Sequence, residues 1–578
     1  MTTIEGPQQL AAEPEPIVAT IVSRWERFEA LLMRAGDHLN PILVKEARQA
    51  LRSRQFLITF FLMLTAGWVW SILGLASIGP AVYFAAEGPQ MLFVYHLFLS
   101  VPLLLVAPYT AFHSLSSERQ DRTYELVSIT ALGARQILTG KLCAIGLQMI
   151  VYLSAIFPCL AFTYLLRGLD IFTIVMVVVY TCGLSIALSV IGLFLGAIAP
   201  LRQRHIAMSV LFAVGLFGAL WIDNLWTYQI VYFGGMRVES SEFWLVQCIL
   251  LTIFLNVCVI AFLAARSQLL TVSENRSTAL RWSLVVAQLS FVAWIAWAQM
   301  SWSDNEIIFG LIYFSTVAWY VAGMFLTSES AALSPRVKRD LPQSLLGRTF
   351  LTWFRPGPGT GYIFVICSMV TVAVFALLPY WWLANLFRDL TVSTSPVGLA
   401  VGTVAIAPPA RPLPNSWELL IAGIVAISYI VFYLGLGSLI VRGLRRYTEV
   451  KLALPVLVNL CLILFGSLTP WVIQMTSPTM RELDWTLVQI PNAIWTLSDI
   501  CFDDMPQDVP VLLTALPAVA LIVFLLNLPA LLDELGHVRA AKPARVEEED
   551  AEEAARRAGA LEPVDPWDER PSRLDSQS

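Results

Sequence analysis

Twelve long apolar segments constrain this chain more than any other feature of its 578 residues. A membrane-spanning helix needs about 20 consecutive, mostly apolar residues. Segments of that kind lie at 56–78, 91–113, 143–166, 171–199, 206–222, 243–265, 282–300, 306–327, 361–386, 416–441, 452–474 and 510–532. Charged residues make up 14% of the chain, whereas an ordinary soluble domain has about 25%. We therefore expect an all-α polytopic membrane protein with about 12 transmembrane helices.

The distribution of Lys and Arg predicts the orientation of these helices. Basic residues are retained on the cytoplasmic side of a membrane. If both ends of the chain lie inside the cell, 32 of the 37 basic residues fall in cytoplasmic segments. The five that then lie outside are Arg167, Arg237, Arg388, Arg411 and Arg481. Because one span more or fewer would exchange the sides of every later loop, the bias and the even count both support an N-in, C-in topology, which we expect in the plasma (inner) membrane.

Composition divides the chain into five parts. We expect cytoplasmic and interfacial N-terminal helices at 1–55, a six-span module at 56–265, a cytoplasmic linker at 266–281, a second six-span module at 282–532 and a charged cytoplasmic tail at 533–578. About 55 residues precede the first span, so we expect no cleaved signal peptide. The alternating charge blocks of the tail are typical of a solvated helix or a disordered segment.

The segment before the first span has the pattern of an amphipathic helix. Within 40–56, apolar residues recur at helical spacing while basic residues occupy the other faces. The apolar positions are Ile42, Leu43, Ala47 and Leu51. We expect this helix to lie on the inner membrane surface with its apolar side in lipid. An ordinary cytoplasmic helix is the alternative.

Charged residues are nearly absent from the predicted spans. His96 and Glu418 are the nearest cases; Glu418 lies in the first turn of its helix, where water can reach it, and we interpret His96 as a buried or interfacial histidine. A carrier driven by protons or sodium needs titratable or coordinating groups near the midplane, so this scarcity argues against such a carrier. The spans also lack GxSxG, HExxH and paired aspartates, and no two of the eight cysteines form a CxxC pair. We therefore expect no enzyme activity and no metal site.

Two glycine-containing stretches differ from a nucleotide-binding loop. In GARQILTGKL (133–142), six residues separate the first glycine from Gly140-Lys141, and Leu142 follows the lysine. A phosphate-binding loop has four residues at that spacing, followed by Ser or Thr. The stretch PGPGTG (356–361) has no lysine. We therefore expect no cofactor in this chain, and a partner must supply the energy if transport consumes ATP.

The polar stretch 114–142 lies between the second and third spans, on the expected cytoplasmic side. Glu118, Arg122 and Glu125 are separated by helical steps, so their side chains can pair on one face of a helix. Leu126, Ile129 and Leu132 supply an apolar edge. A helix of this kind could dock on a protein partner or lie on lipid.

The order of residues in this stretch resembles the corresponding loop of the permease subunits of type-2 ABC exporters, which reads roughly E-R-x-x-G-T-x-E-x-L-x-x-T-P and continues to G-K. The residues that follow this order are Glu118, Arg119, Thr123, Glu125, Leu126, Thr130, Gly140 and Lys141, and Leu126 stands one position before the leucine of the pattern. Arg122 and Ala131 stand where the family has glycine and proline. The resemblance covers about 230 residues, including the amphipathic helix and six spans.

The resemblance implies a partner. It implies that the loop carries a coupling helix that docks into a separate cytoplasmic ABC ATPase subunit, where ATP is hydrolysed. Glu118, Thr123 and Glu125 would order the loop or pair with that subunit, and Leu126 and Ile129 would pack at the junction. The chain would then be the permease subunit of an ABC transporter, an exporter, surrounded by membrane lipids and with no nucleic-acid partner.

Several alternatives stay open at this stage. The chain could instead be an ATP-independent secondary carrier or a polytopic membrane scaffold. The second six spans lack the loop motif. They are either a degenerate permease half, in which case one chain is a pseudo-dimer, or an extra module, in which case two chains would pair as a homodimer. Gly192 and Gly196 form a GxxxG pair that close helix packing explains. The sequence does not identify a transported substrate.

Overall fold

The computed structural model describes residues 40–80, 84–121, 133–198, 202–234, 238–270, 274–302, 305–329, 338, 344, 352–377, 416–447, 453–476, 485–502, 508–535 and 544–557. Within these residues, 12 helices are long and apolar enough to cross a membrane, one for each predicted segment. No strand occurs in this part of the chain. The prediction of an all-α polytopic membrane protein is confirmed, as expected where the bilayer offers backbone groups no water to bind.

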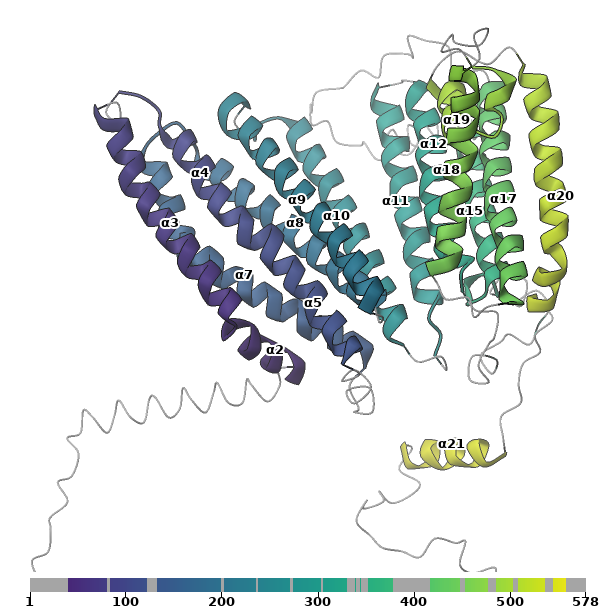
Figure 1. The fold of residues 1–578 in the computed structure, drawn as a ribbon, viewed down its shortest axis with the longest axis horizontal. Helices are drawn as coiled ribbons and strands as arrows, with labels where there is room; N and C mark the ends of the chain where they lie inside the picture. Colours follow the sequence, from purple (N-terminus) through teal and green to yellow (C-terminus); the bar gives the residue numbers. More distant parts are fainter. Residues whose placement is uncertain are drawn as a thin grey trace, which may run out of the picture. The chain divides into compact units, whose positions relative to one another are not determined.

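The chain divides into two compact units, unit 1 (Met1–Leu270) and unit 2 (Thr271–Ser578) (Figure 1). The division falls within the linker predicted at 266–281. Unit 1 contains α2 (Pro41–Leu51), α3 (Arg54–Ile78), α4 (Gly88–Val101), α5 (Ala107–Gln120), α7 (Ala134–Leu165), α8 (Ile171–Ile198), α9 (Arg202–Gln229) and α10 (Ser241–Leu269).

The second span of unit 1 is a continuous rod in which π-helical residues Pro102–Val106 join α4 to α5. Helix α8 packs closely along this rod. A Cβ atom at Gly192 would lie 2.8 Å from the Pro108 carbonyl oxygen, and one at Gly196 would lie 2.7 Å from the Phe112 carbonyl oxygen. Only glycine permits this approach, so the packing role predicted for the GxxxG pair is confirmed.

Unit 2 contains α11 (Thr278–Trp302), α12 (Asn305–Leu326), α15 (Pro358–Leu377), α17 (Ser416–Arg445), α18 (Ala453–Thr476), α19 (Ala493–Phe502), α20 (Val509–Leu535) and α21 (Ala544–Arg557). Short 3-10 turns lie at Thr352–Phe354 and Leu487–Gln489. The segment before α20 folds back onto the unit, where Leu497, Ile500 and Cys501 of α19 are buried in its core. Within the charged tail, α21 is helical, which is one of the two states expected there.

The two units share one pattern of helix neighbours. In each unit the second span packs on the third and the fourth, and the fourth packs on the sixth. The matching pairs are α4 with α7 and α12 with α15, α5 with α8 and α12 with α17, and α8 with α10 and α17 with α20. This shared pattern favours a degenerate repeat of one six-span fold over an unrelated second module.

Candidate coupling junction

A buried lysine joins three helices at the point from which the loop predicted for coupling departs. The Lys141 side chain on α7 is 1% exposed. Its Nζ lies 2.9 Å from Glu46 Oε1 on α2 and 3.1 Å from Glu118 Oε2 on α5, and it donates to the Ser114 carbonyl oxygen at 3.4 Å. An ammonium group has three N–H donors, so each finds an acceptor here. We name Lys141, Glu46, Glu118 and Lys45, with the helix ends that they join, the unit 1 junction.

The exposed Lys45 completes the charge balance of the unit 1 junction. Its Nζ lies 3.4 Å from Glu118 Oε1 and 3.8 Å from Glu46 Oε1, so two ammonium groups face two carboxylates. The Lys45 side chain is 60% exposed, whereas the side chains of Glu46 and Glu118 are 13% and 17% exposed. Solvent screens the outer pair, so the buried inner group dominates the electrostatic energy of the junction.

Gly140 explains how α2 comes close enough to reach this lysine. A Cβ atom at Gly140 would lie 2.9 Å from Ile42 Cβ and 3.0 Å from Asn40 Nδ2. Asn40 caps α2 by accepting from the Ile42 amide at 3.0 Å, and its Nδ2 donates to the Gln136 carbonyl oxygen at 2.6 Å. Gly140 therefore lets α2 pack closely against α7, and Lys141 beside it forms an ion pair with Glu46 of α2.

The predicted amphipathic helix is present as α2, but its apolar side is not wholly in lipid. Ile42 and Ala47 are buried, with relative exposures of 8% and 9%, and α2 packs on α7. Leu43 and Leu51 are partly exposed. The expectation that all four apolar residues face lipid is thus corrected for Ile42 and Ala47, which are buried, and Gly140 provides the space on α7 for Ile42.

Arg119 fixes the other side of α5. Its Nη1 donates to the Ala197 carbonyl oxygen at the end of α8, and its Nη2 donates to the Gln268 carbonyl oxygen at the end of α10 at 3.0 Å. The last carbonyl groups of a helix have no partner within the helix, and a cation there also interacts favourably with the helix dipole. Adjacent residues Glu118 and Arg119 thus tie the end of α5 to α2 and α7 on one side and to α8 and α10 on the other.

Four of the nine residues predicted for coupling meet here, namely Glu118, Arg119, Gly140 and Lys141. The other five, Thr123, Glu125, Leu126, Ile129 and Thr130, lie outside the described residues. Glu118 binds within the chain through Lys45 and Lys141. The described residues therefore hold both ends of the loop, and any docking role falls to the segment between them.

A second junction lies at the corresponding helix ends of unit 2. Arg281, at the start of α11, is fully buried, and its Nη2 lies 2.7 Å from Glu329 Oε2 just after α12. The same guanidinium donates to the Trp353 carbonyl oxygen and, at 3.3 Å, to the Gly357 carbonyl oxygen and Thr360 Oγ1. Glu329 also accepts from the Gly357 amide at 3.0 Å. Glu329 follows the second span of unit 2 as Glu118 ends that of unit 1, although its sequence context lacks the family motif.

Sequence reasoning missed one buried pair of ionisable side chains within unit 1. His96 on α4 and Asp223 on α9 have side-chain exposures of 1% and 6%, and Nε2 lies 3.2 Å from Oδ2. Thr181 on α8 lies 2.9 Å from the same Nε2. The predicted span ended at residue 222, but α9 continues to Gln229. Leu225 and Trp226 continue the apolar run and were the signal for this extension. The spans of unit 1 thus contain a buried aspartate and a buried histidine, which corrects the expectation that charged groups are nearly absent from them.

Comparison with known proteins gives no relative: no family model, curated protein or solved structure matches the chain.

Proposed function

We propose that this chain is the membrane-spanning permease subunit of an ABC transporter, an exporter. A separate cytoplasmic ATPase subunit docks on the loop at 114–142 and supplies the energy of ATP hydrolysis. The chain itself is not an enzyme and holds no cofactor.

The observation that carries the proposal is the unit 1 junction beneath the motif. A docking loop transmits force only if its ends are attached to helices that move as one body. Glu118 and Arg119 at one end and Lys141 at the other form ion pairs and hydrogen bonds that join α2, α5, α7, α8 and α10, and Gly140 lets α2 approach α7 closely. The four motif residues that the structure describes thus join both ends of the loop to the helices of unit 1, which supports a coupling role for the segment between them.

The proposal is tested by purifying the tagged chain from its native membranes and measuring co-purified ATPase activity. We expect an ABC ATPase subunit in the preparation. Leu126→Asp should remove it, because a charge at the centre of an apolar contact costs about 2 kcal/mol, or about 30-fold in affinity. Glu125→Ala should lower ATPase stimulation.

The matched control removes a carboxylate from another expected cytoplasmic segment. Glu274, in the linker 266–281, is exposed, so Glu274→Ala should leave ATPase binding unchanged. If Leu126→Asp and Glu125→Ala behave like Glu274→Ala, the residue assignment is wrong. If no ATPase subunit co-purifies with the wild-type chain, the permease proposal fails.

The pair of His96 and Asp223 favours a second candidate function, an ATP-independent carrier coupled to protons. Ionisable groups inside a membrane are costly and commonly mark ion pathways. Here the imidazole and the carboxylate meet two threonine hydroxyl groups, Thr181 Oγ1 at 2.9 Å and Thr227 Oγ1 at 3.4 Å from His96 Nε2. His96 Nδ1 is buried and has no hydrogen-bond partner among the described residues.

The carrier candidate is tested with the purified chain in liposomes under a pH gradient and without ATP. It predicts proton flux that Asp223→Asn abolishes and that Glu239→Gln, at an exposed acid of the same unit, preserves. Such a result would replace the permease proposal. Absence of flux in the wild-type chain removes the carrier candidate.

A further inference from the structure

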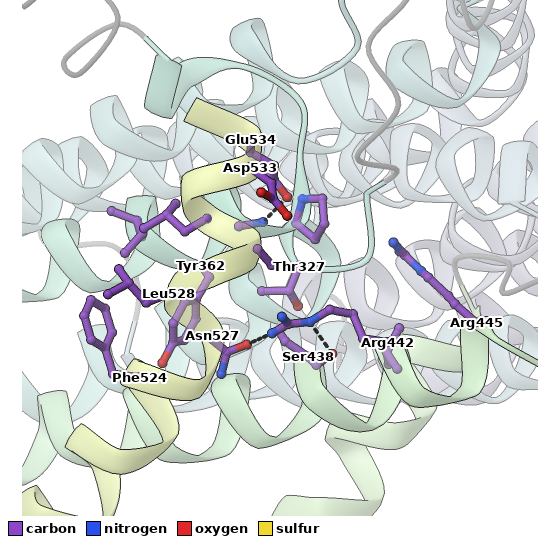
Figure 2. Close-up of a pocket in the computed structure, with 16 residues that line it drawn as sticks. Thr327, Tyr362, Ser438, Arg442, Arg445, Phe524, Asn527, Leu528, Asp533 and Glu534 are labelled. Atoms are coloured by element: carbon purple, nitrogen blue, oxygen red, sulfur yellow. Dashed lines mark hydrogen bonds between the residues drawn. The ribbon is translucent and has the colours of Figure 1, made fainter. Parts of the chain in front are cut away.

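A cavity of about 430 Å³ lies at the end of unit 2 where α12, α15, α17 and α20 meet (Figure 2). Its lining combines arginines, carboxylates, amide and hydroxyl groups with apolar side chains. Pockets of 300 to 1,000 Å³ are typical of sites for small ligands. The cavity belongs to no part of the proposed coupling loop.

One wall of the cavity is basic. Arg442 and Arg445 lie three residues apart at the end of α17. Arg442 donates through Nη2 to Asn527 Oδ1 and through Nε to the Ser438 carbonyl oxygen at 3.4 Å, as Figure 2 shows. Arg445 donates through Nη2 to the Glu329 carbonyl oxygen at 3.1 Å. Each guanidinium has five N–H donors, and the described residues engage only some of them, so both groups can still bind a phosphate.

The facing wall on α20 carries two carboxylates with different surroundings. Glu534 is buried and accepts from the Gly359 and Thr360 amides, each at 2.9 Å, at the start of α15. Asp533 is exposed and lines the cavity without a hydrogen-bond or ion-pair partner among the described residues. The cavity therefore presents two cations and one accessible anion, a combination that suits a zwitterion.

The lining changes character along α20. Phe524 and Leu528 lie deeper in the helix, and Asp533 and Glu534 lie at its end. Phe524 and Glu534 are ten residues apart in sequence, about 15 Å along a helix. Leu525 and Leu532 on the same helix are 53% and 57% exposed, which places the outer face of α20 in lipid. This order of apolar groups below charged groups matches that of acyl chain and headgroup in a phospholipid.

We propose that the cavity binds the headgroup of a phospholipid with a primary amine, of the phosphatidylethanolamine class. Arg442 and Arg445 bind the phosphate, Asp533 binds the ammonium group, and the acyl chain runs along Phe524 and Leu528. A phosphoethanolamine group has about 8 non-hydrogen atoms, which this volume accommodates. Basic sites between spans at the cytoplasmic side are a general mode of lipid headgroup binding, and the charge count predicts that side for this end of the unit.

The test measures lipid retention by native mass spectrometry on the purified full-length chain. The chain is offered phosphatidylethanolamine and phosphatidylglycerol with the same acyl chains, and soluble phosphoethanolamine as competitor. We expect phosphatidylethanolamine to be retained at least about tenfold better than phosphatidylglycerol. Arg442→Gln/Arg445→Gln should lose this retention, and Arg446→Gln, at an exposed neighbouring arginine, should keep it.

Asp533→Asn keeps the test decisive if the arginine variant does not fold, because Asp533 is exposed and has no hydrogen-bond or ion-pair partner among the described residues. We expect this variant to retain both lipids equally. Equal retention by the wild-type chain would overturn the proposal, as would unchanged retention in the folded double arginine variant. Displacement of the lipid by millimolar phosphoethanolamine would also overturn it, since the site would then take a soluble phosphate.

Discussion

Replacing Lys141 with methionine should release α2 from unit 1. Methionine fills nearly the same volume but carries no charge. The substitution removes the buried cation shared by Glu46 and Glu118, whose side-chain exposures are 13% and 17%, and leaves the exposed Lys45 near both. Two partly buried carboxylates without their shared cation repel each other and retain their desolvation cost.

The magnitude follows from the burial of the group. Removing one partner of a buried ion pair costs about 3 to 5 kcal/mol, and the remaining contact with Lys45 places this case at the lower end, about 3 kcal/mol. For a large domain about 1 kcal/mol corresponds to about 2 °C in the midpoint of thermal unfolding. We therefore expect Lys141→Met to lower that midpoint by about 6 °C.

The assay is intrinsic tryptophan fluorescence of the chain in a fixed detergent during heating. Glu118→Gln alone should cost less than Lys141→Met, because Glu46 still pairs with the lysine at 2.9 Å. The triple variant Glu46→Gln/Glu118→Gln/Lys141→Met should recover most of the loss, since it leaves no buried charge. A Lys141→Met midpoint within about 1 °C of wild type, or a triple variant no better than the single one, would refute the electrostatic account of the junction.

Three further predictions follow from single contacts. Gly140→Val should separate α2 from α7 and destabilise the chain by about 1 to 3 kcal/mol. Gly146→Val on the same helix should be neutral, because a Cβ there meets nothing within 4 Å. The accessibility of a cysteine placed in α2 checks both outcomes. Arg281→Lys should lower the free energy of unfolding by about 2 to 4 kcal/mol, because one ammonium group cannot bind all the acceptors that the guanidinium reaches and leaves buried ones unsatisfied. Arg446→Lys, at an exposed arginine, should change it little in the same thermal assay. Burial acts to raise the pKa of Asp170, but hydrogen bonds from the first turn of α8 outweigh it and lower the pKa below its ordinary value. The ionised carboxylate therefore stabilises the folded chain at pH values above the unfolded pKa of about 3.9, and this stabilisation is lost as the pH falls through the folded pKa. The stability difference between wild type and Asp170→Asn should thus shrink only below about pH 4.

The spans were predictable because the bilayer imposes one rule on every helix that crosses it. A run of about 20 apolar residues is required whatever the helix packs against, so hydropathy alone located all twelve. Close packing of α8 on a neighbouring helix was predictable for a similar reason, since two glycines four residues apart leave one face of a helix bare, but the glycines do not identify α5 as that neighbour.

The contacts of the candidate site could not be predicted because they join distant residues. Lys141 finds Glu46, which lies 95 residues earlier in the chain, and nothing around either residue marks them as partners. Arg281 and Glu329 pair over 48 residues without a motif on either side. Asp223 was missed for a local reason. An aspartate at the edge of an apolar run usually indicates the end of a span, but α9 continues past it.

The buried cations of the two junctions bind different groups, and this difference predicts that the ATPase docks unequally on the two units. In unit 2, Arg281 binds the carbonyl groups of Trp353 and Gly357, which belong to the connection between α12 and α15 that corresponds to the proposed docking loop. The described end of that connection, residues 352–357, is thus held at the helix ends by its own backbone. We expect the ATPase to dock mainly on unit 1. A charge at Leu346, in the counterpart segment of unit 2, should therefore reduce co-purified ATPase much less than Leu126→Asp, and equal losses from the two substitutions would show that both units dock alike.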